Sequence, residues 1–224
     1  MVFNRAGAVG ILQCLIAAAI VCLPTAARAE RPVNVVWISA EDISADTLGC
    51  YGGPAHTPRL DALAAGGLRF DAAFSAAPVC APSRSAIITG VMPTTLGSLP
   101  MRCRATPPPF VVGLPKMLRD AGYFCTNNVK TDYNFEWDTA IYDGEDWSGR
   151  KPGQPFFMQV QLPGGKLRDG PGGLERVRQR ATAAFGAPTA PATVTLPPYL
   201  PRDPVLLADR AAYLDAVRLT DAHV

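Results

Sequence analysis

Histidine is scarce in this chain, and its cysteines do not cluster. Only His56 and His223 supply an imidazole among 224 residues, and no two of the six cysteines have CxxC spacing. Structural and catalytic zinc sites take their ligands mainly from grouped histidine and cysteine side chains. A dithiol redox centre of the common kind needs closely spaced cysteines. The sequence therefore excludes both kinds of site as its main chemistry.

The chain also lacks an excess of charge of either sign. Its 21 Lys and Arg residues face 19 Asp and Glu residues, which gives a formal net charge of +2. Two of the basic residues, Arg5 and Arg28, lie in the first 29 residues, so the rest of the chain carries no net charge. Proteins that bind nucleic acid or anionic membranes through charge need a basic surface. No nucleic-acid partner is expected.

Residues 1–29 have the parts of a secretory signal peptide. Arg5 gives a positive start, residues 9–23 are largely apolar, and an A-x-A cleavage site ends at Ala29. The apolar run is short for a membrane span, which needs about 20 residues. A membrane anchor is the alternative. We expect cleavage, export to the periplasm or the exterior, and no stable membrane insertion after cleavage.

The state of the cysteines that follow the signal peptide stays open at this stage. Four cysteines in an exported chain allow a disulfide framework with three connectivities. Cys80 is therefore either paired in a disulfide or free to act as a nucleophile. The four are Cys50, Cys80, Cys103 and Cys125.

Short apolar runs alternate with helical patterns along the chain, which predicts an α/β fold with a mostly parallel sheet flanked by helices. The stretch 163–204 is rich in Gly and Pro and is expected to be irregular apart from one helix. The predicted strands are 33–39, which reads as buried, 68–75, 123–127 and 156–161. The predicted helices open at Thr57-Pro58 and at Cys80, cover 114–121 and 174–185, and end with a helix carrying Leu207, Ala211, Leu214 and Val217 on one face and running to residue 224.

Two adjacent acids, Glu41 and Asp42, follow the first predicted strand directly. Open α/β sheets place their sites beyond the carboxyl ends of their strands. Carboxylate oxygens are the ligands that calcium and magnesium prefer. The pair is therefore a candidate cation site, with a solvated turn as the ordinary alternative.

The stretch 80–90 reads CAPSRSAIITG. Pro82 suits the first turn of a helix, so Cys80 is expected at a helix N-terminus, where unpaired N–H groups attract anions. Arg84 lies one turn further on and carries a fork of donors that fits the oxygens of a sulfate or phosphate. The alternative is a helix start with a buried or disulfide-bonded cysteine.

This motif, Cys-x-Pro-Ser-Arg with a following Thr-Gly, resembles the signature of the type I sulfatases, the formylglycine-dependent, arylsulfatase-like family of the alkaline phosphatase superfamily. The resemblance runs from about Val33 to the C-terminus and covers only the front of the family's catalytic domain. It implies an alkaline-phosphatase-like sheet, truncated at its C-terminal side, with residues 30–224 as the N-terminal part of the catalytic domain. It also implies that Cys80 is oxidised to formylglycine by an external generating enzyme, an expected partner.

The resemblance further implies a divalent cation, usually calcium and otherwise magnesium. Glu41, Asp42 and the hydrated aldehyde of residue 80 would be ligands, although the family usually has two aspartates. One hydroxyl of the hydrate attacks sulfur, and the other later expels sulfate. The family's remaining ligands come from a strand beyond the last helix, which this chain does not reach.

Three basic residues complete the predicted site. Arg84 resembles the arginine that steadies the hydrated aldehyde, and Lys130, just past a strand, resembles the lysine that binds the sulfate group. Lys166 either supplies a positive charge to the sulfate or is an ordinary loop lysine. The family's two histidines near these lysines are absent, so the acid that protonates the leaving group is unassigned.

The implied function is hydrolysis of sulfate esters of a small molecule or, more specifically, a carbohydrate. One alternative is a non-catalytic remnant of such an enzyme. A phosphoester or phosphonate-ester hydrolase of the same superfamily is the other, because some of those enzymes use the same formylglycine and similar metals.

Overall fold

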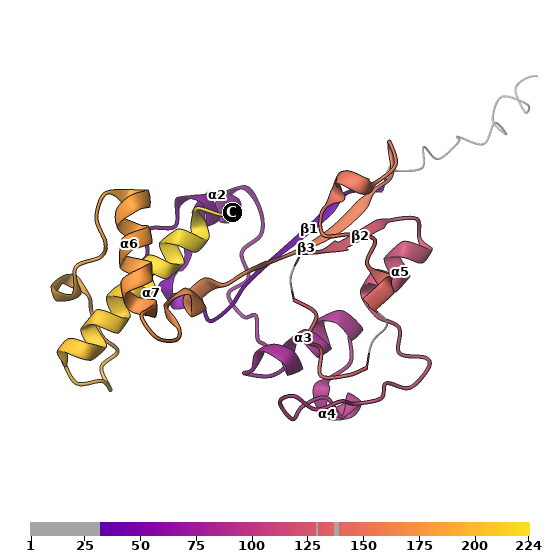
Figure 1. The fold of residues 1–224 in the computed structure, drawn as a ribbon, viewed down its shortest axis with the longest axis horizontal. Coiled ribbons are helices and arrows are strands. Elements are labelled where there is room, and N and C mark those ends of the chain that lie inside the picture. Colours follow the sequence, from indigo (N-terminus) through magenta and orange to yellow (C-terminus); the bar gives the residue numbers. More distant parts are fainter. Residues whose placement is uncertain (1–31, 129, 137–138) are drawn as a thin grey trace, which may run out of the picture. The chain divides into compact units, whose positions relative to one another are not determined.

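Three parallel strands form the one sheet in the described part of the chain: β1 (Val35–Ala40), β2 (Phe124–Asn127) and β3 (Phe156–Leu162). The strand order is β1-β3-β2, with β3 in the centre (Figure 1). The parallel pairing brings the carboxyl ends of all three strands to one edge. This arrangement confirms the predicted parallel sheet, and each of these strands was predicted to within two residues.

The structure is a computed structural model that describes residues 32–128, 130–136 and 139–224. The predicted signal peptide, residues 1–29, lies outside the described residues. The sheet, the helices and the sites all belong to the unit Asn34–Val224. None of the helices described within it has the length and hydrophobicity of a membrane span.

Strand β1 is half-exposed, which corrects the prediction of a buried strand. Its residues alternate between half-buried and exposed positions. Val36 and Ile38 are 49% and 41% exposed, whereas Trp37 faces the protein. Among the described strands β1 pairs with β3 alone. It is therefore an edge strand with one covered face, and the β-branched run does not by itself fix two-sided burial.

The predicted strand at 68–75 does not form. These residues have no regular secondary structure, and Leu68, Phe70 and Phe74 are 86%, 69% and 91% exposed. A strand exists only where a neighbour takes its backbone hydrogen bonds, and none of the three described strands pairs with this segment. The alternation of apolar residues was present, but the partner was not.

Helix α2 (Pro58–Gly66) begins after Thr57, as predicted, but a distant residue caps it. The Thr57 side chain makes no cap bond and instead donates to Asp61 at 3.0 Å. The buried carboxylate of Asp221 accepts from the backbone N–H groups of Arg59 at 3.3 Å and Leu60 at 2.8 Å. The last turn of the chain's final helix thus satisfies the first turn of α2.

Helix α3 (Cys80–Thr89) starts at Cys80, and α5 (Leu114–Asp120) precedes β2, both as predicted. The expected apolar face of α5 is incomplete, because Met117 is 58% exposed. The remaining short elements are α4 (Pro93–Leu96) and the 3-10 helices η1 (Ala45–Thr47), η2 (Gly49–Tyr51), η3 (Thr139–Ile141), η4 (Trp147–Gly149), η5 (Gly164–Arg168) and η6 (Pro191–Thr193).

Helices α6 (Gly173–Phe185) and α7 (Pro204–Asp221) pack side by side (Figure 1). The predicted face of α7 lies in one apolar cluster, in which Leu214 and Val217 pack with Ala55 and Val194. A second face, with Ala212 and Ala216, packs against Val177 of α6. Helix α7 is therefore buried on two sides rather than one. It ends at Asp221, three residues before the predicted end.

Candidate active site

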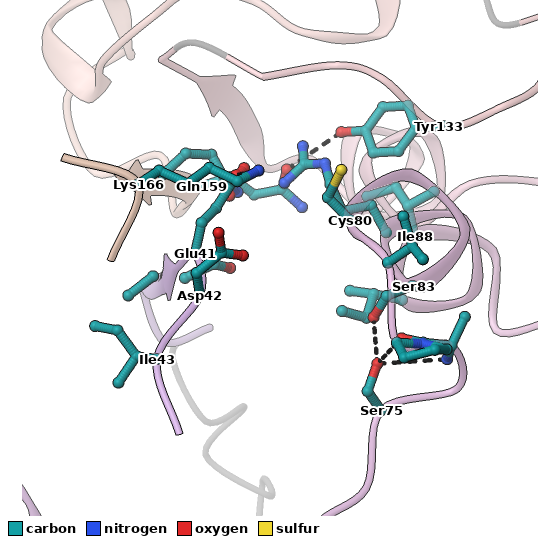
Figure 2. Close-up of a pocket in the computed structure, with 18 of the residues that line it drawn as sticks. Glu41, Asp42, Ile43, Ser75, Cys80, Ser83, Ile88, Tyr133, Gln159 and Lys166 are labelled. Carbon is teal, nitrogen blue, oxygen red and sulfur yellow. Dashed lines mark hydrogen bonds and ion pairs between the residues drawn. The ribbon is translucent and has the colours of Figure 1, made fainter. Parts of the chain in front are cut away.

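A cavity of about 640 Å³ opens at the carboxyl edge of the sheet (Figure 2). Its walls come from the segment after β1, from β3, from the start of α3 and from η5. Five of the six predicted site residues line it: Glu41, Asp42, Cys80, Arg84 and Lys166. The sixth, Lys130, contacts Glu41 through its ammonium group. The fold thus brings together side chains as far as 125 positions apart in the sequence.

Cys80 is the first residue of α3, on the opposite wall from Glu41 and Asp42 (Figure 2). Val79 before it is extended, and its carbonyl accepts from the N–H of Ser83 at 3.1 Å. The hydroxyl of Ser83 is 2.8 Å from that of Ser75 and fixes the incoming loop. The side chain at position 80 is thereby held at a helix N-terminus, where backbone N–H groups favour an anion.

All four described cysteines are free, so Cys80 is not tied into a disulfide. Cys80 is half-buried in the cavity wall, whereas Cys125 is fully buried. Burial, together with the charge of Asp143, raises the pKa of the Cys125 thiol to about 12. A buried thiol of that kind is chemically inert. Cys80 is the described cysteine that combines exposure to the cavity with a helix N-terminus.

Both carboxylate oxygens of Glu41 contact ammonium groups. Lys130 contacts Oε1, and Lys166 contacts Oε2. Burial by itself would raise the pKa of Glu41, but the hydrogen bonds and charges of the two lysines lower it below its ordinary value. The bond to Glu41 in turn raises the pKa of Lys166. The site therefore holds one carboxylate between two cations.

A close backbone approach seats Lys166 beside Glu41. The N–H of Gly165 donates to the carbonyl of Glu41 at 2.9 Å. Gly164 has φ +56°, and a Cβ at that position would lie 1.9 Å from the same carbonyl oxygen. Only glycine tolerates both conditions. The Pro-Gly-Gly-Lys stretch after β3 is thus built to carry its lysine into the site, which supports a placed residue over an ordinary loop lysine.

Arg84 joins α3 to the segment that follows β2. Its Nε lies 3.2 Å from Oδ1 of Asp132, its Nη2 donates to the carbonyl of Lys130, and its guanidinium lies 5.2 Å from the ring centroid of Tyr133. The side chain is only 11% exposed. The pair with Asp132 lacks hydrogen-bond geometry, since Nε and Oδ1 are buried without a hydrogen-bond partner. The hydrogen bond to the Lys130 carbonyl, the charge of Asp132 and the Tyr133 ring together hold Arg84 in place.

Asp132 and Gln159 are site residues that were not predicted from the sequence. Asp132 lies near three cations, Arg84, Arg102 at 3.7 Å and Lys130 at 4.0 Å. It occupies the place of an absent histidine, two positions after Lys130. Gln159 points into the cavity from the central strand β3, and its Oε1 accepts hydrogen bonds from the side chains of Tyr133 and Asn127. The alternation of polar and apolar residues along β3 was the one feature of the sequence that could have indicated Gln159.

The donor types at the site suit a hard divalent cation. Glu41 and Asp42 offer carboxylates, and Asp42 makes no hydrogen bond within the described residues. Gln161 lines the same cavity, and its Oε1 is buried without a hydrogen-bond partner in the described part of the chain. Oxygens of these kinds bind calcium. The described residues contain no group of three or more His, Cys, Asp or Glu side chains that could hold a metal by themselves.

Comparisons with known proteins agree with the motif. Residues 33–128 match the family model described as Sulfatase. The chain is 38% identical over 144 residues to an ulvan-active sulfatase of Formosa agariphila, covering 57% of this chain and 24% of that protein. It is 49% identical over 71 residues to human arylsulfatase A, covering 31% of this chain and 14% of that protein. The chain therefore spans a quarter or less of these relatives.

Solved structures share the fold. One from Bacteroides thetaiotaomicron, from work on glycosaminoglycan metabolism, aligns with a TM-score of 0.62 at 16% identity over 85% of this chain and 56% of that chain. Another, solved in complex with its substrate D-glucosamine-2-N,6-O-disulfate, aligns with a TM-score of 0.57 at 21% identity over 76% of this chain and 40% of that chain. The three-stranded parallel sheet and its helices are thus part of an alkaline-phosphatase-like fold.

Proposed function

Because this chain belongs to the sulfatase family through its residues 33–128, we propose that it takes part in hydrolysing sulfate esters of a carbohydrate, with residue 80 as the nucleophile. One observation carries the proposal: Cys80 shares a cavity with two carboxylates, an arginine and a lysine. Residues 30–224 would be the N-terminal part of the catalytic domain. Residues 1–29 would direct export to the periplasm or beyond, as a signal peptide.

The nucleophile of this proposal is formylglycine made from Cys80 by a generating enzyme. Its hydrate would supply one hydroxyl that attacks sulfur as the S–O bond to the alcohol breaks. Its second hydroxyl would lose a proton as the aldehyde re-forms and the C–O bond to sulfate breaks. The chain itself positions residue 80. The first turn of α3 holds residue 80 against the cavity, and the helix N-terminus favours the negative charge of a bound sulfate group.

Lys130, Lys166 and Arg84 would bind and orient the sulfate group. The two lysines lie on opposite oxygens of Glu41, so their ammonium groups already hold a pair of oxyanion oxygens. Arg84 adds a planar fork of donors one helical turn from Cys80. Asp132 orients that guanidinium by charge. Substrate sulfate would thus meet cations whose positions are fixed before it arrives.

A calcium or magnesium ion would be held by Glu41, Asp42 and residue 80, with Gln161 offering an additional oxygen. When bound, such an ion lowers the pKa of a hydroxyl that coordinates it and neutralises developing charge. Glu41 has to be released from at least one lysine to serve as a ligand. The protonation of the leaving group stays unassigned, because the described cavity is lined by no histidine.

The experiment compares a matched pair of aryl esters, one sulfate and one phosphate, after co-expression of the chain with a generating enzyme. The proposal predicts faster turnover of the sulfate ester. Cys80→Ala should lower that rate about a thousandfold or more, whereas Cys103→Ala, outside the cavity, should not. Faster turnover of phosphate would support the phosphoester alternative. No turnover of either ester by chain that carries the aldehyde would support an inactive remnant.

A further inference from the structure

A second cavity of about 440 Å³ adjoins the candidate active site and shares Asp42 and Ile43 with it. Its other walls come from the end of η5, from the loop around Pro197 and from α7. A volume of this size falls in the usual range of small-ligand pockets. Apart from Asp42, none of the residues given a part in the proposed chemistry lines this cavity. The function of its other walls is therefore open.

One face of α7 forms the longest wall. Leu206, Asp209, Arg210 and Tyr213 line the cavity, and their spacing of i, i+3, i+4 and i+7 is that of a single helix face. The faces of α7 that pack in the two apolar clusters lie on other sides of the helix. This face is therefore available to a ligand, apart from Tyr213, whose ring also belongs to the core.

The two arginines of the cavity differ in whether a carboxylate pairs with their charge. Arg168 lies 3.0 Å from Asp209 and donates to the carbonyl of Gly165 at 2.7 Å. Arg210 contacts the Tyr213 ring at 5.2 Å but makes no hydrogen bond or ion pair with the described residues. Its Nε is buried without a hydrogen-bond partner. A buried donor without an acceptor is costly, and no carboxylate of the described residues pairs with this guanidinium. An anion in the cavity would supply the missing counter-charge.

The rest of the wall is apolar. Leu196, Pro197 and Leu200 lie on one side of the cavity, and Leu206 lies on α7. A small inorganic anion would leave these side chains without a contact. A sugar ring has C–H groups that pack on such side chains, and a carboxylate or sulfate on the ring can reach a guanidinium. The wall and Arg210 together fit an anionic sugar.

We propose that this cavity is a subsite that binds a second, negatively charged sugar unit of the substrate, with Arg210 holding its carboxylate or sulfate group. The inference rests on the proposed sulfatase function, since the first sugar would carry its sulfate ester into the cavity beside Cys80. The shared residue Asp42 lies where the two units meet. The preferred substrate is then an oligosaccharide with anionic groups on adjacent sugars.

The experiment measures binding by titration calorimetry, without turnover, using the chain in its Cys80→Ala form. Three disaccharides carry the same sulfate ester on one sugar and differ on the other, which is neutral, carboxylated or sulfated. The second anion should tighten binding by about tenfold, as expected for a charge-assisted hydrogen bond. Arg210→Gln should remove that gain and leave the neutral disaccharide unaffected. The carboxylated and sulfated arms identify the anion.

Two further variants keep the result interpretable. Arg180→Gln removes a positive charge from an exposed position on α6 and should keep the full gain. Leu200→Trp fills the cavity without altering its charge and should abolish the gain in affinity from the second anion. This variant tests the subsite independently if Arg210→Gln fails to fold. Equal affinity for the three disaccharides would overturn the subsite. Failure to bind any sulfated sugar, including a monosaccharide sulfate, would instead overturn the proposed function.

Discussion

Glu41 and Lys130 form an ion pair across 89 residues of sequence. The pair joins the segment after β1 to the segment after β2, although the two strands lie on opposite sides of β3. Lys166, which follows β3, contacts the other oxygen of Glu41. One carboxylate thus gathers residues that follow all three described strands, and the carboxyl edge of the sheet becomes a single site.

The stability that Glu41 contributes should depend on pH in a defined window. Its pKa is below the ordinary 4.5, so its ion pairs stabilise the fold above that pH and are lost as pH falls through the lowered pKa. The pKa of Lys166 is above 10.5, so its contribution is lost only as pH rises through the raised pKa. The difference in free energy of unfolding between wild type and Glu41→Gln should be largest between these limits and should shrink below pH 4.5.

Urea unfolding of both proteins across that pH range measures the difference. Glu145→Gln is the control, because it removes an exposed carboxylate outside the site. A difference that stays constant down to strongly acidic pH would mean that the two lysines do not pair with Glu41 in solution.

Calcium and Lys166 should compete for Glu41. Because an ammonium group occupies Oε2, a cation that binds there must displace it and face its charge. Lys166→Met should therefore raise calcium affinity roughly tenfold, about 1.4 kcal/mol. The same variant should weaken sulfate binding. Calorimetric titration with calcium and separately with sulfate measures both effects.

The control for that titration is Lys151→Met, which removes an exposed charge outside the cavity. If the wild type, Lys166→Met and Glu41→Gln all fail to bind calcium, the proposed cation ligands are wrong.

Arg84 should stabilise the protein as well as the site. Arg84→Ala removes a nearly buried guanidinium and leaves Asp132, 26% exposed, without its nearest cation. The loss of a partly buried charged partner should cost about 2 to 3 kcal/mol of unfolding free energy. Lys116→Ala, which breaks the exposed pair with Asp120 at 2.8 Å, should cost about 0.5 kcal/mol or less. Denaturant titration that gives equal costs for both would show that Arg84 is not structurally anchored.

The Asp221 cap of α2 should contribute as much to the free energy of unfolding as a cap from a neighbouring residue would. Asp221→Ala leaves the N–H groups of Arg59 and Leu60 without their acceptor, which should cost about 1 to 2 kcal/mol. Asp221→Asn keeps an acceptor oxygen and should recover part of that loss. Thermal melting of both variants measures it, and a cost no larger than that of the exposed Asp71→Ala would contradict the cap.

Local signals in the sequence were sufficient for the site's main elements. Short apolar runs located all three strands, and the acids and lysines that follow them met because parallel strands end at one edge. Pro82 located the start of α3 at Cys80. These features depend on a few neighbouring residues each.

Features that depend on distant partners were not predictable. The 68–75 segment has the alternation of a strand, but none of the described strands pairs with it. Asp221 caps a helix more than 160 positions away, and Asp132 pairs with Arg84 because α3 and the segment after β2 happen to meet. The second buried face of α7 carries Ala212 and Ala216 beside Leu219, and the two alanines give only a weak hydrophobic signal.

The mass of the peptide that contains residue 80, taken from chain co-expressed with a generating enzyme, tests most directly whether Cys80 gives rise to the nucleophile. An aldehyde is expected at residue 80, with unmodified thiols at Cys50, Cys103 and Cys125. A thiol or a disulfide at Cys80, in a preparation where the same generating enzyme converts a reference substrate, would contradict this expectation.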